Sequence, residues 1–388
     1  MGQMSFLFIL HAHLPFIKHS NTPGSVEESW FFDALSYTYL PLLRSCAALE
    51  AEGVPFRFAI AFSPTFCEML ADQTLQTRYV DYLEHAIELG ISELEKDDVS
   101  PEKKQLIKQT IERIRINLHD YVEVHEMNIL RKFDYFAGCG YIEILATTAT
   151  PCFIPLFIDI PETINAQIET GLVTYRKYFT SIPSGFWLPA LGWAPGIDSI
   201  LKSYGFKYTI LESHGILFAD QSADSGIFAP AYCKNGFAVI GRDKFACQEV
   251  TDPEEGLSAN PVYLDINSDI GFYLDKTRLS GLYDVSLGRR STGFRFYSKE
   301  RSPAGESMLY SPERAAQQLE TDVKSFLHRR LDVLREASRL DEKPVFLACA
   351  FPASFLEMYG TRASPGLKSC SDRLPQLTPL CSPCLHCI

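Results

Sequence analysis

The sequence has few basic residues for its size and no long hydrophobic run. Its 36 lysines and arginines are outnumbered by 48 aspartates and glutamates, and the net charge of -12 argues against nucleic acid or an anionic membrane as a partner. The apolar start from Met4 to Pro15 is short, lacks a basic beginning and contains two histidines, so it is a poor signal peptide. No later run is long enough to span a bilayer. We therefore expect a cytoplasmic protein.

The composition does not limit the chain to one domain. With 388 residues and 46% hydrophobic content, it can bury the core of one large domain or of two ordinary ones. Seven of the eleven cysteines are scattered singly, which is expected of reduced core thiols: Cys46, Cys67, Cys139, Cys152, Cys233, Cys247 and Cys349. The other four lie within the last nineteen residues.

One stretch combines aromatic residues with a strand-to-helix turn. Residues 185–196 (GFWLPALGWAPG) indicate a buried strand that ends near Pro189, a turn, and a helix that begins near Pro195. The carboxyl end of such a strand is where α/β enzymes place catalytic groups. Trp187 and Trp193, with Phe186, suggest a wall on which a flat ligand stacks, and plain core packing explains the same residues equally well.

Strand and helix patterns alternate along the rest of the chain. Strands are predicted at 5–10, 56–62, 141–146, 207–211 and 344–351, and helices at 28–49, 161–179 and 311–339. Residues 75–136 are highly charged with helical spacing, and we interpret them as a helical insertion with a mostly solvated face and no chemistry. The alternation predicts a parallel sheet, either open or closed.

Two histidines follow the first predicted strand. Side chains alternate along a strand, so His11 and His13 are expected to point the same way at its exit. They could grip a hydroxylated ligand, form hydrogen bonds inside the core, or bind zinc. Zinc needs further ligands, which no local spacing supplies. We rank the ligand-gripping role first and zinc last.

Several of these stretches resemble the motifs of glycoside hydrolase family 57, which contains α-glucan branching enzymes and amylase-like proteins. The similar segments are 11–16 (HAHLPF) with 27–32 (EESWFF), 185–189 (GFWLP), 212–215 (ESHG) and 269–272 (DIGF). The resemblance covers roughly residues 4 to 351. It implies an incomplete, seven-stranded parallel (β/α) barrel with helical insertions, whose site lies at the carboxyl ends of the strands, followed in the family by a helical domain.

The resemblance also implies an activity and a set of sugar contacts. Family members of this type act on α-1,4-glucans such as glycogen or amylose, as retaining hydrolases or as 1,4-α-glucan branching glycosyltransferases. For this chain we expect no cofactor and no metal. The residues that would contact the glucan are His11, His13, Trp30, Trp187, Trp193 and His214.

This chain departs from the family pattern where the chemistry is done. The family nucleophile is a glutamate, and its position is occupied by Ala190. Pro151 stands where the family has a histidine, and residues 250–256 (VTDPEEG) lack the tryptophan that precedes the family's Ser-x-Glu-Glu-Gly. Pro352 lies approximately at the position of the aspartate that is the family's acid/base.

The tail from residue 352 contains a hidden match to the family's fourth motif. Permitted codons for residues 354–363, read one base earlier, encode Glu-Leu-Phe-Gly-Asn-Val-Trp-Tyr-Glu-Gly, which is that motif with its tryptophan in place. We therefore expect residues 1–351 to form the barrel domain and residues 352–388 to be out of frame. The alternative is that Cys370 and the cysteines of 381–387 (CSPCLHC) form a zinc or iron–sulfur clip.

Three interpretations of function remain open. The chain is an active branching-enzyme homologue, a catalytically dead α-glucan-binding protein (a pseudoenzyme), or the product of a decayed gene. We predict no branching or hydrolysis above a trace, because the nucleophile and the acid/base are both missing. The sequence does not indicate the oligomeric state.

Overall fold

The computed structural model describes residues 4–17, 25–221, 223–280, 282–283, 285–340 and 343–356. Its centre is a parallel barrel of seven strands in the order β10-β1-β2-β3-β4-β5-β7, and the pair Ala348–Arg242 closes β10 onto β7. These strands are β1 (Met4–Ala12), β2 (Phe58–Phe62), β3 (Ile142–Thr147), β4 (Gly185–Trp187), β5 (Tyr208–Glu212), β7 (Ala238–Arg242) and β10 (Val345–Pro352). The prediction of a seven-stranded parallel barrel is confirmed.

Among the described residues, three further strands lie outside the barrel. The short β6 (Ala231–Tyr232) runs antiparallel to β7, and β8 (Tyr297–Arg301) pairs with β9 (Ser307–Leu309) in a separate hairpin.

Alternate residues of the barrel strands belong to two separate apolar cores. On β1, Leu7 and Ile9 pack inside the barrel, whereas Phe6 and Leu10 pack against the surrounding helices. Residues of the other strands divide in the same way, so both faces of the sheet are buried. Such burial explains why the strands read as continuous apolar runs rather than as alternating ones.

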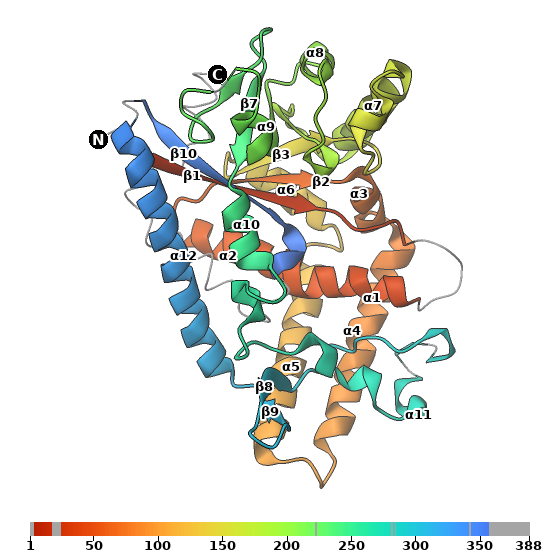
Figure 1. Ribbon diagram of the computed structural model, residues 1–388. Helices are drawn as coiled ribbons and strands as arrows, with labels where there is room; N and C mark the ends of the chain where they lie inside the picture. The colour runs from red at the N-terminus through yellow and green to blue at the C-terminus, as the bar shows by residue number, and fades with distance from the viewer. Residues whose placement is uncertain are drawn as a thin grey trace.

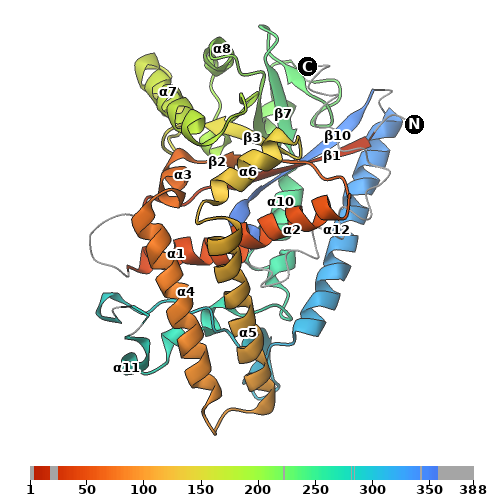
Figure 2. The same cartoon turned by 180° about the vertical axis from the view of Figure 1, so that it is seen from behind.

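The helices surround the barrel and extend from one end of it. They are α1 (Val26–Asp33), α2 (Leu40–Ala51), α3 (Pro64–Leu70), α4 (Gln73–Leu94), α5 (Pro101–His119), α6 (Ile129–Gly138), α7 (Pro161–Tyr178), α8 (Ile197–Ser203), α9 (Ser213–Leu217), α10 (Lys244–Thr251), α11 (Lys276–Leu279) and α12 (Pro312–Leu340). Figure 1 shows α12 along one side and the α4–α5 hairpin projecting away from the barrel. In the reverse view, α6 and α7 lie on the side of β3 (Figure 2).

The predicted helix over 28–49 is one continuous helical segment with a wider turn inside it. Residues Ala34–Tyr39 form a π-helical turn between α1 and α2. Such turns are rare and often lie at functional sites. Here the turn buries Tyr37, whose hydroxyl donates to the carbonyl oxygen of Gly293 at 3.3 Å.

The helical insertion is more than a solvated face. The helix α5 directs Arg113 to the carbonyl oxygen of Gly293, at 3.1 Å, and α4 buries Tyr79 completely. Arg295 forms an ion pair with Asp33 at 3.2 Å and lies beside Asp269, which is fully buried. This charged network joins the insertion to the segment between α10 and β8, a role that its surface-like composition did not suggest.

The prediction of buried thiols is confirmed at some positions and wrong at one. Cys46, Cys67 and Cys349 are buried, and burial raises the pKa of the Cys46 thiol to about 12. Cys139, in contrast, is exposed just after the end of α6. None of the helices in the described ranges is both long and apolar enough to cross a bilayer.

Candidate active site

The carboxyl ends of the seven strands form one mouth of the barrel. Because side chains alternate, the last inward-facing residue of each strand follows from the interior core. These residues are His11 on β1, Ala61 on β2, Thr147 on β3, Trp187 on β4, Glu212 on β5, Arg242 on β7 and Pro352 on β10. Sites of parallel barrels lie at this end, since the following loops supply additional groups. We call these seven residues the mouth ring.

Three of the predicted sugar contacts are in direct ring contact at this mouth. The His11 imidazole stacks on the indole of Trp187, with ring centroids 4.9 Å apart and planes 15° apart. His13 stacks on His11 at 5.7 Å, and its Nδ1 lies 3.0 Å from the hydroxyl of Ser63. The two histidines thus point the same way, as the alternation predicted.

Burial keeps both imidazoles neutral. It lowers the pKa of His11 to about 4, and the neighbouring His13 lowers it further because two cations would repel each other. Burial also lowers the pKa of His13. A neutral imidazole offers one donor and one acceptor, which matches the two roles of a sugar hydroxyl.

The turn after β4 is strained at the predicted nucleophile position. Ala190 has φ 51° and ψ 18°, a left-handed conformation that a non-glycine residue adopts at a cost, and Leu191 also has φ 51°. Ala190 is exposed, whereas Leu191 is buried. A Cβ on Gly192 would lie 2.4 Å from the Phe153 ring, so this glycine allows the loops after β3 and β4 to pack together.

The remaining predicted contacts lie on elements that follow the strands. Trp30 is 47% exposed on α1, Trp193 is half-buried in the loop after β4, and His214 is exposed on α9, directly after β5. No ring contact joins these three residues to His11 or Trp187 in the described ranges. Trp30, Trp193 and His214 are therefore candidates for sugar contacts on the elements that surround the mouth, outside the mouth ring itself.

One part of the proposed aromatic wall is wrong. Phe186 is fully buried and packs outward on Phe206, with ring centroids 4.9 Å apart. It alternates with the inward-facing Trp187, so the two rings lie on opposite faces of β4. The period of a strand explains the error, because adjacent aromatic residues cannot share one face.

Two of the departures from the family pattern, Pro151 and Pro352, lie at or just after the end of a barrel strand. Pro151 is exposed just after β3. Pro352 ends β10 and pairs in register with His11 on β1. Around the closed barrel, β4 and β10 are separated by β5 and β7, so Ala190 and Pro352 follow strands on different sides of the mouth.

An ion pair in the mouth ring was missed by the sequence analysis. Glu212 and Arg242 face each other in register on β5 and β7 and form an ion pair. Glu212 was noted only as part of the family-like stretch 212–215, and Arg242 was not singled out. The signal that could have identified them is a charged residue at the last inward position of a buried strand.

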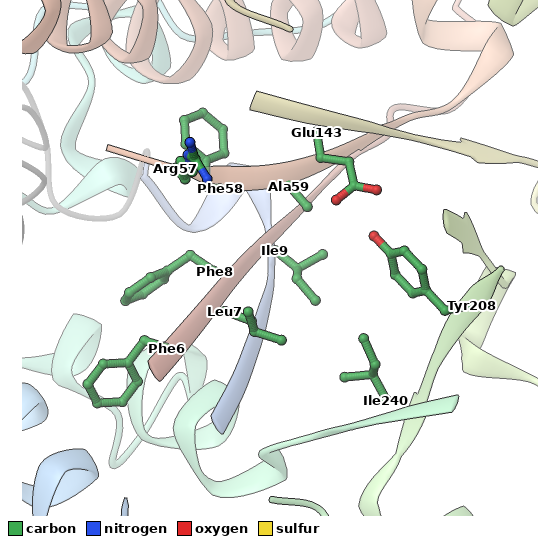
Figure 3. Close-up of a pocket in the computed structure, with 10 residues that line it drawn as sticks. All are labelled: Phe6, Leu7, Phe8, Ile9, Arg57, Phe58, Ala59, Glu143, Tyr208 and Ile240. Atoms are coloured by element: carbon green, nitrogen blue, oxygen red, sulfur yellow. The ribbon is translucent and has the colours of Figure 1, made fainter. Parts of the chain in front are cut away.

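The cavity in Figure 3 lies at the opposite end of the barrel from this site. Its volume is about 30 Å³, enough for about two water molecules rather than a sugar ring. The side chains of Glu143 and Tyr208 point toward each other within it (Figure 3), and burial raises the pKa of Glu143.

The described side chains form no cluster of three histidines, cysteines or carboxylates that could hold a metal ion. The predicted cysteine clip at 381–387, with Cys370, lies outside the described residues.

A parallel (β/α) barrel with stacked aromatic and polar side chains at the carboxyl ends of its strands is the arrangement in which such barrels place their binding and active sites. Residues 7–319 match the family model of glycosyl hydrolase family 57. The chain belongs to this family.

Its relatives are named as enzymes of α-glucans. The chain is 26% identical over 372 residues to a 1,4-α-glucan branching enzyme of Thermococcus kodakarensis, with 88% of this chain and 51% of that protein covered. The structure resembles the crystal structure of the α-amylase AmyC of Thermotoga maritima with a TM-score of 0.88 and 28% identity, covering 96% of this chain and 71% of that one. The branching enzyme of Pyrococcus horikoshii gives a TM-score of 0.78 and 25% identity over 95% and 66% of the two chains.

The chain spans about half the length of this Thermococcus relative. It covers 64% of a probable branching enzyme of Mycobacterium tuberculosis, to which it is 22% identical over 92% of its own residues. The matched part is thus the barrel and its insertions.

Proposed function

We propose that this chain binds α-glucans at the barrel mouth without turning them over. The observation that carries the proposal is Ala190, which is exposed on the strained turn after β4. Backbone strain of this kind persists where the surrounding structure holds it, often at functional sites. At this strained position the side chain is a methyl group, which cannot attack an anomeric carbon.

The missing groups are the two that a retaining glycosidase requires. One carboxylate attacks the anomeric carbon, and a second carboxyl group protonates the leaving oxygen and later activates water. Ala190 supplies no nucleophile. Pro352, at the approximate position of the second group, can neither donate nor accept a proton, and general acid–base catalysis is typically worth about 10²–10⁴-fold.

The groups suited to binding are present. His11 and His13 are neutral and offer hydrogen bonds to hydroxyls, while Trp30 and Trp193 present indole surface on elements that follow the strands. Sugar sites combine such apolar faces with a few placed polar groups. His214 adds a polar side chain after β5. We propose that the ligand is a glycogen- or amylose-like glucan and that the protein binds it in the cytoplasm, where scattered free thiols are common.

The second candidate is an active 1,4-α-glucan branching or hydrolysing enzyme. The names of the relatives favour it. It would need a nucleophile other than residue 190, because an alanine side chain cannot attack an anomeric carbon.

We also propose that the chain leaves its original reading frame near residue 352. Residues 357–388 lie outside the described residues, so the proposal rests on the codon argument alone. Reading the gene one base earlier from the codons of 344–352 tests it. A frame that stays open and encodes further helical sequence supports the proposal, whereas an immediate stop codon contradicts it.

The experiment for the central proposal restores the nucleophile alone. The donor is α-glucosyl fluoride, whose fluoride leaves without protonation while a carboxylate oxygen attacks the anomeric carbon. We expect Ala190→Glu to accumulate a covalent glucosyl adduct, detected by intact mass, and the unmodified chain and Ala190→Gln to form none. An adduct on the unmodified chain would show another nucleophile and support the second candidate. No adduct on an Ala190→Glu variant that binds maltohexaose would show that residue 190 is not the nucleophile position.

A further inference from the structure

Three polar atoms in the mouth ring are buried and have no hydrogen-bond partner within the described part of the chain. They are Trp187 Nε1, Glu212 Oε2 and Arg242 Nε. Buried polar groups in folded proteins almost always have partners, and a group without one requires an explanation. Two of these atoms are donors and one is an acceptor, and all three belong to the last inward-facing residues of neighbouring strands β4, β5 and β7.

The orientation of the ion pair follows from the residues around it. On β5, Tyr208 and Ile210 pack inside the barrel, and Glu212 continues that alternation. On β7, Ala238 and Ile240 do the same, and Arg242 follows. These side chains therefore point into the barrel at its mouth.

The residue after Arg242 confirms this alternation. Asp243 points to the outer face, where its Oδ2 accepts from Arg330 Nη1 of α12 at 2.7 Å. Adjacent charged residues of β7 and its exit thus serve different faces: Asp243 holds a helix to the outside of the barrel, whereas Arg242 lies inside.

The ion pair is partly buried and remains partly unsatisfied. The side chains of Glu212 and Arg242 are 22% and 21% exposed, so water reaches them only in part. One oxygen of Glu212 accepts from Arg242 Nη2, which leaves the second oxygen and the Arg242 Nε for another partner. Trp187 is only 5% exposed, and no described residue accepts a hydrogen bond from its indole N–H.

A polyhydroxylated ring satisfies this arrangement. Each sugar hydroxyl is both a donor and an acceptor, so two adjacent hydroxyls can donate to the free Glu212 oxygen and accept from the two N–H groups. Hydrogen bonds to the charged carboxylate and guanidinium groups are stronger than those between neutral groups. Ala61 and Ala350 are the small inward-facing residues of β2 and β10 near this end.

We propose that Glu212, Arg242 and the Trp187 indole N–H form the floor of the sugar site and bind two adjacent hydroxyls of one glucose unit. The inference rests on the proposed function and adds the residues that would determine specificity for the sugar. In a chain without a nucleophile, this floor supplies the polar contacts that would fix the ring in place.

The test compares variants of the pair with a variant of its outward neighbour. Maltohexaose binding is measured by calorimetry on the full chain, unmodified and as Glu212→Gln, Arg242→Lys and Asp243→Asn. Hydrogen bonds to charged groups imply that each of the first two substitutions weakens binding about 10- to 100-fold. Asp243→Asn alters an ion pair on the outer face and is expected to lower the melting temperature without changing the affinity.

A deoxy-sugar panel separates contact from a structural role. If Glu212 touches a hydroxyl, one monodeoxy maltoside binds the unmodified chain more weakly than maltose does, and Glu212→Gln loses that discrimination. If the pair is merely structural, the discrimination persists in the variant, and the inference is overturned.

A final measurement needs no variant. Phenylglyoxal modifies accessible arginines, and peptide mass spectrometry reads the modification of Arg242 with and without maltohexaose. We expect protection by maltohexaose, and unchanged modification under saturating ligand would refute the inference. Failure of the unmodified chain to bind maltohexaose at all would instead refute the proposed function, and the inference with it.

Discussion

Replacing Ala190 with glycine is expected to stabilise the protein. The alanine holds φ 51° and ψ 18°, and its exposed methyl group makes no core contact that glycine would lose. A left-handed conformation costs a non-glycine residue about 1–2 kcal/mol. Glycine adds about 0.5–1 kcal/mol of backbone entropy lost on folding. The difference predicts that Ala190→Gly raises the free energy of unfolding by about 0.5–1 kcal/mol.

The assay is urea denaturation at equilibrium, with Ala194→Gly as the matched control. Ala194 lies in the same loop and is not among the described residues with positive φ. Glycine there loses backbone entropy and a partly buried methyl group that packs on the core, so the control should lose at least about 0.5–1 kcal/mol. If Ala190→Gly is destabilised like the control, the turn is not strained, and the argument from strain at residue 190 fails.

Three further substitutions test other parts of the structure. Asp269→Ala should lower the free energy of unfolding by about 3–5 kcal/mol. The buried carboxylate of Asp269 accepts hydrogen bonds from the backbone N–H groups of Gly271, Thr292 and Gly293 at 2.8–2.9 Å and lies beside Arg295. A loss under about 1 kcal/mol in urea denaturation would contradict this prediction. The pKa of His11 is about 4 in the folded chain and has an ordinary value of 6.5, so unfolding takes up a proton at pH values between the two. The free energy of unfolding should therefore fall by up to about 3 kcal/mol as the pH drops from 6.5 to 4. The His11→Gln variant should not show this loss. Burial raises the pKa of Glu143, so its contribution to stability is lost as the pH rises; Glu143→Gln should therefore raise the melting temperature at pH 8 relative to the unmodified chain and not at pH 4.

The barrel could be predicted from the sequence because its strands carry strong local signals. The predicted strand 5–10 lies within Met4–Ala12, and the predicted 207–211 overlaps Tyr208–Glu212. Closure of the sheet could not be predicted from these patterns, since it rests on the single pair Ala348–Arg242, which joins residues far apart in the chain. The resemblance to the family, rather than periodicity, supplied the expectation of a barrel.

The candidate site was predictable only in part. Strand alternation predicted that His11 and His13 point the same way. It could not predict the stacking of Trp187 on His11, because that contact depends on how β1 and β4 approach each other across the barrel. Glu212 and Arg242 were missed for a related reason. Their partnership arises from the register of β5 on β7, which local sequence does not reveal.

The role of the insertion also escaped prediction. Its charged composition indicated solvent exposure, yet Arg113 reaches the carbonyl oxygen of Gly293, about 180 positions away in the chain. Charge patterns describe a helix surface well, but they do not distinguish a solvated arginine from one that binds a distant backbone group.

Binding and turnover measured on one preparation test the central claim most directly. The protein, purified free of host amylases, is titrated with maltohexaose and then incubated with amylose, and the products are analysed for shortened and branched chains. The account predicts saturable binding with no product above that of a mock preparation. Reproducible product from the unmodified chain, or the absence of binding, would contradict it.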